Sequence, residues 1–243
     1  MELVPYMRVL SFIPVALLAS AAYGHYTWIT PETAFVAGKP VMIRIGHGHA
    51  FPSSEETINA AQLDLFVLTP SGKRVPVKAA TAVKSVAASY TPTESGPHTI
   101  AFVQDRGVSS RTPKGLKKGG RDVNPDALTA SRTLRTAVAA ASATGARPLG
   151  LEVELTAQLA SGVWTVQLLR AGKPHAGATV EVFLAGASSA VVAGKTDAEG
   201  KVRYQPPAGA VKRALFAAEL KSAAPQGASY DAVNYETSLF VSW

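Results

Sequence analysis

The stretch GHYTWITPETAFVAGKPVMIRIGHGHAFP, residues 24–52, contains three of the five histidines of the chain. Within it, valine or isoleucine occupies every second position of residues 41–45 (VMIRI), which indicates a strand with one buried face. His47 and His49 continue the same alternation, so both imidazoles are expected on the buried side where the strand ends. The stretch therefore predicts a β-sheet with two histidines at its rim.

An apolar run, Val9–Ala19, precedes this stretch. Its length is below the ~20 residues that cross a bilayer, and small residues follow it, as in a secretory signal peptide. Cleavage after Gly24 and cleavage after Ala21 both satisfy the small-x-small rule. We therefore expect residues 1–24 to be a signal peptide and the protein to be periplasmic.

Cleavage after Gly24 would make His25 the first residue of the mature protein, with its α-amine and its imidazole as two nitrogen donors. Cleavage after Ala21 would leave three residues ahead of His25 and remove this arrangement. Amine and imidazole nitrogens suit Cu(II), Ni(II) and Zn(II). His25, His47 and His49 are accordingly the candidate metal ligands.

Two carboxylates, Glu55 and Glu56, follow these histidines closely. They are candidates for outer partners that orient an imidazole, and they are equally compatible with plain surface charge. His98 and His175 lie far away in the sequence, and no ligand role is expected for them.

Composition excludes several classes of function. The chain has no cysteine, so it has neither disulfides nor thiolate metal sites. Its net charge is +7, but aromatic and basic residues do not interleave as in nucleic-acid-binding surfaces, and no nucleic-acid partner is expected. No nucleophile elbow or catalytic order of Ser, His and Asp is present, and we do not expect an enzyme.

The rest of the chain consists largely of short apolar segments separated by turn residues, which is typical of β-sandwiches. Residues 25–104 are expected to form an N-terminal sandwich and residues 150–243 a C-terminal Ig-like domain. The connecting segment, residues 105–149, is expected to contain a basic solvated loop followed by a helix over Asp126–Ser142. The predicted fold is thus all-β, with two β-sandwich domains and one helix between them.

Four motifs together resemble the DUF4198 family. They are H-x-x-W-x-x-P at residues 25–31, G-H-x-F-P at 48–52, P-L-G-L-x-x-E at 148–154, and G-K-P-x-x-G-A-x-V with T-D-A-E-G-K-V between 172 and 202. The family consists of exported bacterial proteins associated with nickel or cobalt uptake. The resemblance implies a divalent metal ion as ligand, Ni(II) ahead of Cu(II) or Co(II), and a membrane metal transporter as partner. His175 departs from the family pattern, so no role is carried over to it.

The sequence thus predicts a periplasmic protein that captures Ni(II), or Co(II) or Cu(II), and supplies a membrane transporter. Intrinsic affinities place Cu(II) ahead of Ni(II), so the choice of nickel depends on the resemblance. One alternative is an oxidative enzyme with a copper histidine brace, because such enzymes also use a terminal histidine with a second histidine. Another is an Ig-like structural or adhesion module without metal.

Overall fold

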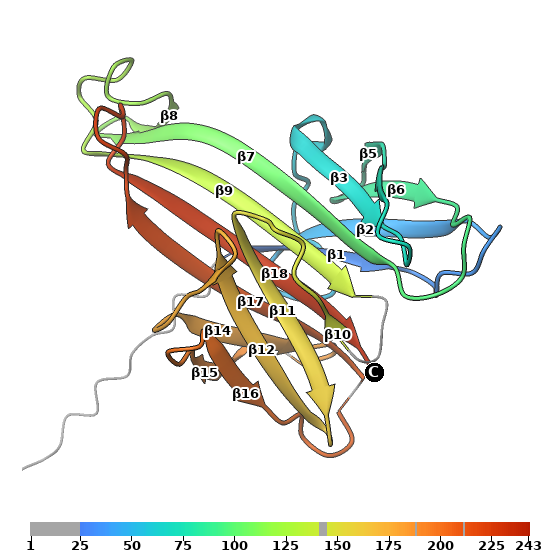
Figure 1. The fold of residues 1–243 in the computed structure, drawn as a ribbon. Coiled ribbons are helices and arrows are strands. Elements are labelled where there is room, and N and C mark those ends of the chain that lie inside the picture. Colours follow the sequence, from blue (N-terminus) through green and yellow to red (C-terminus); the bar gives the residue numbers. More distant parts are fainter. Residues whose placement is uncertain (1–24, 141–144, 188, 211) are drawn as a thin grey trace, which may run out of the picture.

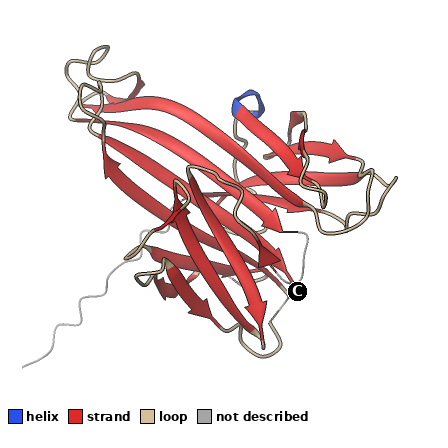
Figure 2. Ribbon diagram, in the orientation of Figure 1, coloured by secondary structure: helices blue, strands red, loops and turns tan. Residues whose placement is uncertain are grey.

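The computed structural model describes residues 25–140, 145–187, 189–210 and 212–243. Apart from one 3-10 turn, η1 (Ala60–Gln62), every regular element in these ranges is a β-strand (Figures 1 and 2). The first half contains β1 (Tyr26–Pro31), β2 (Val41–Gly48), β3 (Leu63–Leu68), β4 (Arg74–Pro76), β5 (Ala79–Ala82), β6 (Ser85–Tyr90), β7 (Thr99–Thr112), β8 (Gly115–Lys118) and β9 (Thr129–Ala140). The second half contains β10 (Gly145–Ala146), β11 (Val153–Ala160), β12 (Val163–Arg170), β13 (Lys173–Pro174), β14 (Thr179–Leu184), β15 (Val191–Lys195), β16 (Lys201–Tyr204), β17 (Arg213–Ala223) and β18 (Ala232–Ser242). No helix in the described ranges is long and apolar enough to cross a membrane.

The strands form three sheets. The largest, which we call the long sheet, has the order β15-β14-β17-β18-β9-β7-β3-β4, with β8 added to β7. A second sheet has the order β1-β2-β6-β5, and a third has the order β10-β11-β12-β13, with β16 added to β12. Neighbouring strands are antiparallel except β9 and β18, which run parallel at the centre of the long sheet.

The long sheet carries a second layer on each face (Figure 1). On one face, Trp164 and Leu168 of β12 pack with Phe216 of β17. On the other, Ile43 of β2 belongs to the same core as Phe240 of β18. Each interface buries the apolar face of two sheets, as in a β-sandwich. The prediction of an all-β protein built from β-sandwiches is confirmed.

The predicted helix over residues 126–142 is wrong. Most of this segment forms β9, which lies between β7 and β18 in the long sheet, while Ser142 lies outside the described residues. The prediction depended on Leu128, Leu134 and Val138, which share one face at helical spacing, and on Gly145 and Pro148 as end signals. Tertiary packing overrides that local pattern, because β9 is buried on both faces from Arg135 to Ala140 and its small side chains let two layers approach the sheet.

The first part of the basic segment that follows Asp105, as far as Lys118, is also not a loop, whereas residues 119–128 are. β7 passes through a bulge after Asp105, stays paired with β9 as far as Arg111, and returns as β8. A strand that is solvated on one face accepts this many polar and charged residues. The positive charges as far as Lys118 therefore sit on a β-hairpin, and Arg121 lies in the loop that follows it.

The long sheet combines strands from both expected domains. β3, β4 and the first part of β7 come from the first, and β14, β15, β17 and β18 come from the second. β9, from the expected connecting segment, joins them. The division of the chain at Gly150 stays a prediction.

Candidate metal centre

Pairing of β1 with β2 brings the predicted ligands together. The two strands are antiparallel, with Tyr26 opposite Gly48 and Thr27 opposite His47. One step further along this register, His25 comes to face His49, and the centroids of their imidazoles are 3.8 Å apart. The meeting of these two histidines is therefore a direct consequence of strand register.

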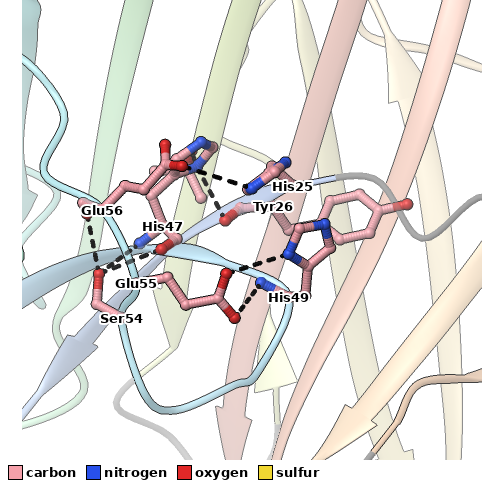
Figure 3. Close-up of polar contacts among 8 residues, drawn as sticks. His25, Tyr26, His47, His49, Ser54, Glu55 and Glu56 are labelled. Carbon is pink, nitrogen blue, oxygen red and sulfur yellow. Dashed lines mark hydrogen bonds and ion pairs between the residues drawn. The ribbon is translucent and has the colours of Figure 1, made fainter.

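A carboxylate completes a three-residue cluster with this pair (Figure 3). His25, His49 and Glu55 each offer one donor atom, and the three atoms lie within 4.8 Å of one another. His25 and Glu55 are exposed and His49 is half-buried, so an ion from solvent has access to the cluster. Two imidazole nitrogens and one carboxylate oxygen form a donor set that suits a divalent transition metal.

Two hydrogen bonds hold Glu55 beside His49. The Nδ1 atom of His49 lies 3.1 Å from Glu55 Oε2, and the backbone N–H of His49 donates to Glu55 Oε1 over 3.2 Å. These bonds favour the charged carboxylate and lower the pKa of Glu55 below its usual value. Glu55 is thus poised as an anionic donor.

The loop that carries Glu55 folds back on the end of β2. The backbone N–H of Glu55 donates to the carbonyl of His47 over 2.9 Å, and the N–H of His47 donates to Ser54 Oγ over 2.9 Å. Phe51 anchors the loop, since its buried ring meets Trp28 edge-on with 5.7 Å between centroids. These contacts therefore hold the loop against the sheet, unlike a surface loop that makes few contacts.

His47 lies beneath the cluster and is only 7% exposed. Its Nδ1 atom is 3.1 Å from the carbonyl oxygen of Tyr26 and 2.9 Å from Thr27 Oγ1. Because a carbonyl oxygen only accepts, the neutral ring carries its proton on Nδ1 and keeps a lone pair on Nε2. Burial, then the positive charge of Arg135, then His25 lower the pKa of His47 to about 4. The ring is therefore neutral at physiological pH, the form in which imidazole binds metals.

Charged groups of the long sheet lie next to the site. The side chain of Arg135 on β9 is almost fully buried and pairs with Glu236 on β18. The hydroxyl of Tyr26 donates to Glu181 Oε2 on β14 over 2.9 Å. The bond from Tyr26 ties the start of β1 to the long sheet, next to His25.

The structure brings together all three histidines that the sequence singles out. The rings of His25 and His47 stack with 5.3 Å between centroids, although His47 is not among the three closest donors. Glu55, expected as an outer partner, lies within direct reach of an ion. Glu56 stays further out, with its Oε1 3.8 Å from His25 Nε2.

The other two histidines lie elsewhere. His98 is fully buried and stacks on Phe35 at 4.7 Å between ring centroids, while its Nδ1 lies 3.0 Å from the carbonyl oxygen of Gly96. His175 follows β13 in a surface loop, where its carbonyl accepts from Thr196 Oγ1. Neither belongs to the cluster.

The fold and the cluster define a β-sandwich protein with a histidine and carboxylate site at a sheet edge. Residues 22–211 match the family DUF4198, described as a domain of unknown function, and the chain therefore belongs to this family. No curated protein matched the chain. Among solved structures, the chain is similar to one described as "D0-D1 domain of Intimin", with 10% identity over 89% of this chain and 97% of that one. The TM-score of 0.23 is too low for that likeness to carry an argument.

Proposed function

We propose that the protein is a periplasmic metal-binding protein that captures Ni(II), or Co(II) or Cu(II), and supplies it to a membrane transporter. The observation that carries the proposal is the convergence of His25, His49 and Glu55, whose donor atoms lie within 4.8 Å of one another. Strand register and a folded-back loop place these groups, so the cluster needs little reorganisation to receive an ion.

His47 supports the proposal as a further donor. Its Nδ1 is engaged by the backbone of Tyr26, so Nε2 is the nitrogen left to act as a ligand. Such a bond to the second ring nitrogen is typical of metal-binding histidines, because it fixes the tautomer and the ring orientation. The assignment of Ni(II) rather than Cu(II) depends on the family resemblance, since intrinsic affinity favours copper.

Calorimetric titration with Ni(II), Co(II) and Cu(II) tests the site. His49→Ala and Glu55→Gln are each expected to weaken binding, the histidine change by more than tenfold and the glutamate change by roughly tenfold. His175→Ala removes an imidazole outside the cluster and serves as the matched control, with unchanged affinity expected. Equal losses in all three variants would mean that metal binds the surface nonspecifically.

The role of the terminal amine requires a separate comparison. If processing leaves His25 first, its α-amine joins the donors, and one added residue ahead of it moves that amine away while keeping every side chain. The extended protein is then expected to bind more weakly or with a changed visible spectrum. The mass of the protein isolated from its native envelope identifies the first residue, and identical affinity and spectrum in both proteins would leave a site of side chains alone.

The close pair His25 and His49 also favours a second candidate, the copper histidine brace. The two candidates differ in chemistry, because a brace enzyme consumes a reductant and oxygen when loaded with copper. Absence of that activity in the copper-loaded protein, together with tight Ni(II) binding, supports the capture function. A structural module without metal would show neither property.

A further inference from the structure

The end of the β7–β8 hairpin and the loop that follows, residues 109–128, form a segment that we call the basic tip. It holds five basic and two acidic residues, a net charge of +3. It lies at the opposite end of the long sheet from the C-terminus (Figure 1). All four residues of β8 are exposed. Arg121 pairs with Asp231, while the described residues provide no carboxylate within 4.0 Å of the other basic groups, Arg111, Lys114, Lys117 and Lys118.

Large apolar side chains are exposed among these charges. Leu116 is 73% exposed, Val123 66% and Leu128 62%. A single exposed leucine needs no explanation, but three large apolar groups within one short cationic segment mark an interaction surface.

Internal hydrogen bonds give the basic tip a fixed shape. Arg121 binds both carboxylate oxygens of Asp231 over 2.9 Å and also donates to the carbonyl of Ala127. The buried side chain of Asn124 donates to the carbonyl of Lys118 over 2.9 Å, and Ser110 Oγ donates to the carbonyl of Gly119 over 2.8 Å. The apolar groups are therefore held outward by an ordered scaffold.

A polar pocket of about 290 Å³ opens beside the hairpin. Arg111, Ser131, Lys221 and Asn234 line it, with Leu116 on its wall. Its carboxylate, Asp231, is already engaged by Arg121. Two cations with hydroxyl and amide donors suit a phosphate group.

We propose that the basic tip docks the protein on an anionic lipid surface, with a headgroup phosphate in this pocket and Leu116 in the interface. Lysines and arginines are attracted to anionic lipids, and exposed leucine and valine add apolar contact at the acyl boundary. A narrow hairpin end offers little of the broad area that a stable protein interface needs, whereas a bilayer accepts a protruding tip. The proposal does not depend on the metal site.

Co-sedimentation with vesicles tests it, using protein without residues 1–24 so that the apolar run Val9–Ala19 cannot bind lipid itself. Binding is expected to phosphatidylglycerol and phosphatidylethanolamine vesicles and to be at least tenfold weaker on pure phosphatidylcholine. The variant with Lys114→Glu, Lys117→Glu and Lys118→Glu should bind anionic vesicles at least tenfold more weakly. Leu116→Ser, which leaves the charge unchanged, should weaken vesicle binding several-fold.

Matched controls separate the basic tip from general charge and general apolarity. Lys39→Glu, Lys78→Glu and Lys195→Glu together change the net charge equally at exposed positions outside the basic tip, and Val83→Ser removes an apolar group that is 90% exposed. Both controls should bind vesicles nearly as the parent does. Three outcomes would overturn the proposal: equal binding to both lipids, no binding to either lipid, or equal losses of binding in the control variants. No binding to either lipid is also the result expected if the basic tip binds an acidic protein instead. Metal titration of the same variants should be unchanged, which keeps this result separate from the proposed metal function.

Discussion

Gly48 is the last residue of β2, between His47 and His49, and it lies against the side chain of Glu55. A Cβ at this position would stand 2.9 Å from Glu55 Cδ, and its φ of +147° is a conformation that L side chains rarely adopt. We predict that Gly48→Ala displaces Glu55, weakens metal binding on the order of tenfold, and lowers the free energy of unfolding by about 1–3 kcal/mol. Titration and thermal unfolding measure the two effects.

Gly38→Ala is the matched control for this change. Gly38 also has a positive φ, +75°, but a Cβ there would meet nothing within 4 Å. Its replacement should cost stability through backbone strain alone and leave metal affinity unchanged. Intact metal affinity in Gly48→Ala would mean that Glu55 is not a ligand.

Asp231 provides a pH-dependent prediction. Hydrogen bonds from Arg121, and then from the backbone of Ala130, lower the pKa of this carboxyl from 3.8 to about 2. Because the folded-state pKa is depressed, the contribution of this carboxylate to stability is present above the ordinary value of 3.8 and is lost as the pH falls through about 2. Asp231→Asn should therefore unfold at a lower temperature than the parent at pH 7 and at nearly the same temperature near pH 2. If the difference in unfolding temperature between the two proteins were the same at every pH in this range, Asp231 would not be the source of the pH dependence.

The sequence predicts the histidines of the site but not the full donor set. Alternation along β2 is a local property, so it places His47 and His49 on one side of a strand without knowledge of the fold. Glu55 reaches His49 through a loop whose path is set by Ser54 and by burial of Phe51 on Trp28. Such contacts leave no periodic signal in the sequence.

At the scale of elements, the small side chains of β9 carry a prediction. Ala139 is fully buried between Ile100 of β7 and Phe240 of β18, under the β1–β2 layer. Ala139→Leu is expected to destabilise the fold by roughly 1–3 kcal/mol, because added methylenes cannot be accommodated between two packed layers. Denaturant unfolding measures the effect, and Thr133→Val on the half-buried part of β9 should change stability far less. An unchanged free energy of unfolding in Ala139→Leu would contradict the burial of β9 between two layers.

Strands with clear apolar alternation are predictable locally. The strand predicted from alternation at residues 41–45 forms β2, which begins at the same residue and extends to Gly48. The errors fall on the first part of the expected basic loop, residues 105–118, and on the expected helix over residues 126–142, which are rich in basic residues and in alanine respectively. The strand conformation of β9 depends on pairing with β18, about a hundred residues away, and that of the second half of β7 depends on pairing with β9; no local pattern identifies either partner.

For the molecule as a whole, the shared long sheet predicts cooperative unfolding. β9 connects β7, which begins in the first expected domain, to β18 of the second, and cores on both faces of the sheet include residues of β9 and β18. Neither half can lose its strands without exposing the core of the other. Calorimetry should therefore show one transition whose calorimetric and van't Hoff enthalpies agree. Two separate transitions would instead support independent domains divided at Gly150.

The parallel pairing of β9 with β18 also bears on when the chain can fold. Thr136 and Thr237, whose hydroxyls share a hydrogen bond across these strands, are 101 residues apart, so the centre of the long sheet stays incomplete until that late segment is available. Contacts of such long sequence separation form slowly, because the entropy of closing the intervening loop is lost before they are made. During synthesis the first half of the chain therefore waits with one edge of β9 unpaired until β18 has been made.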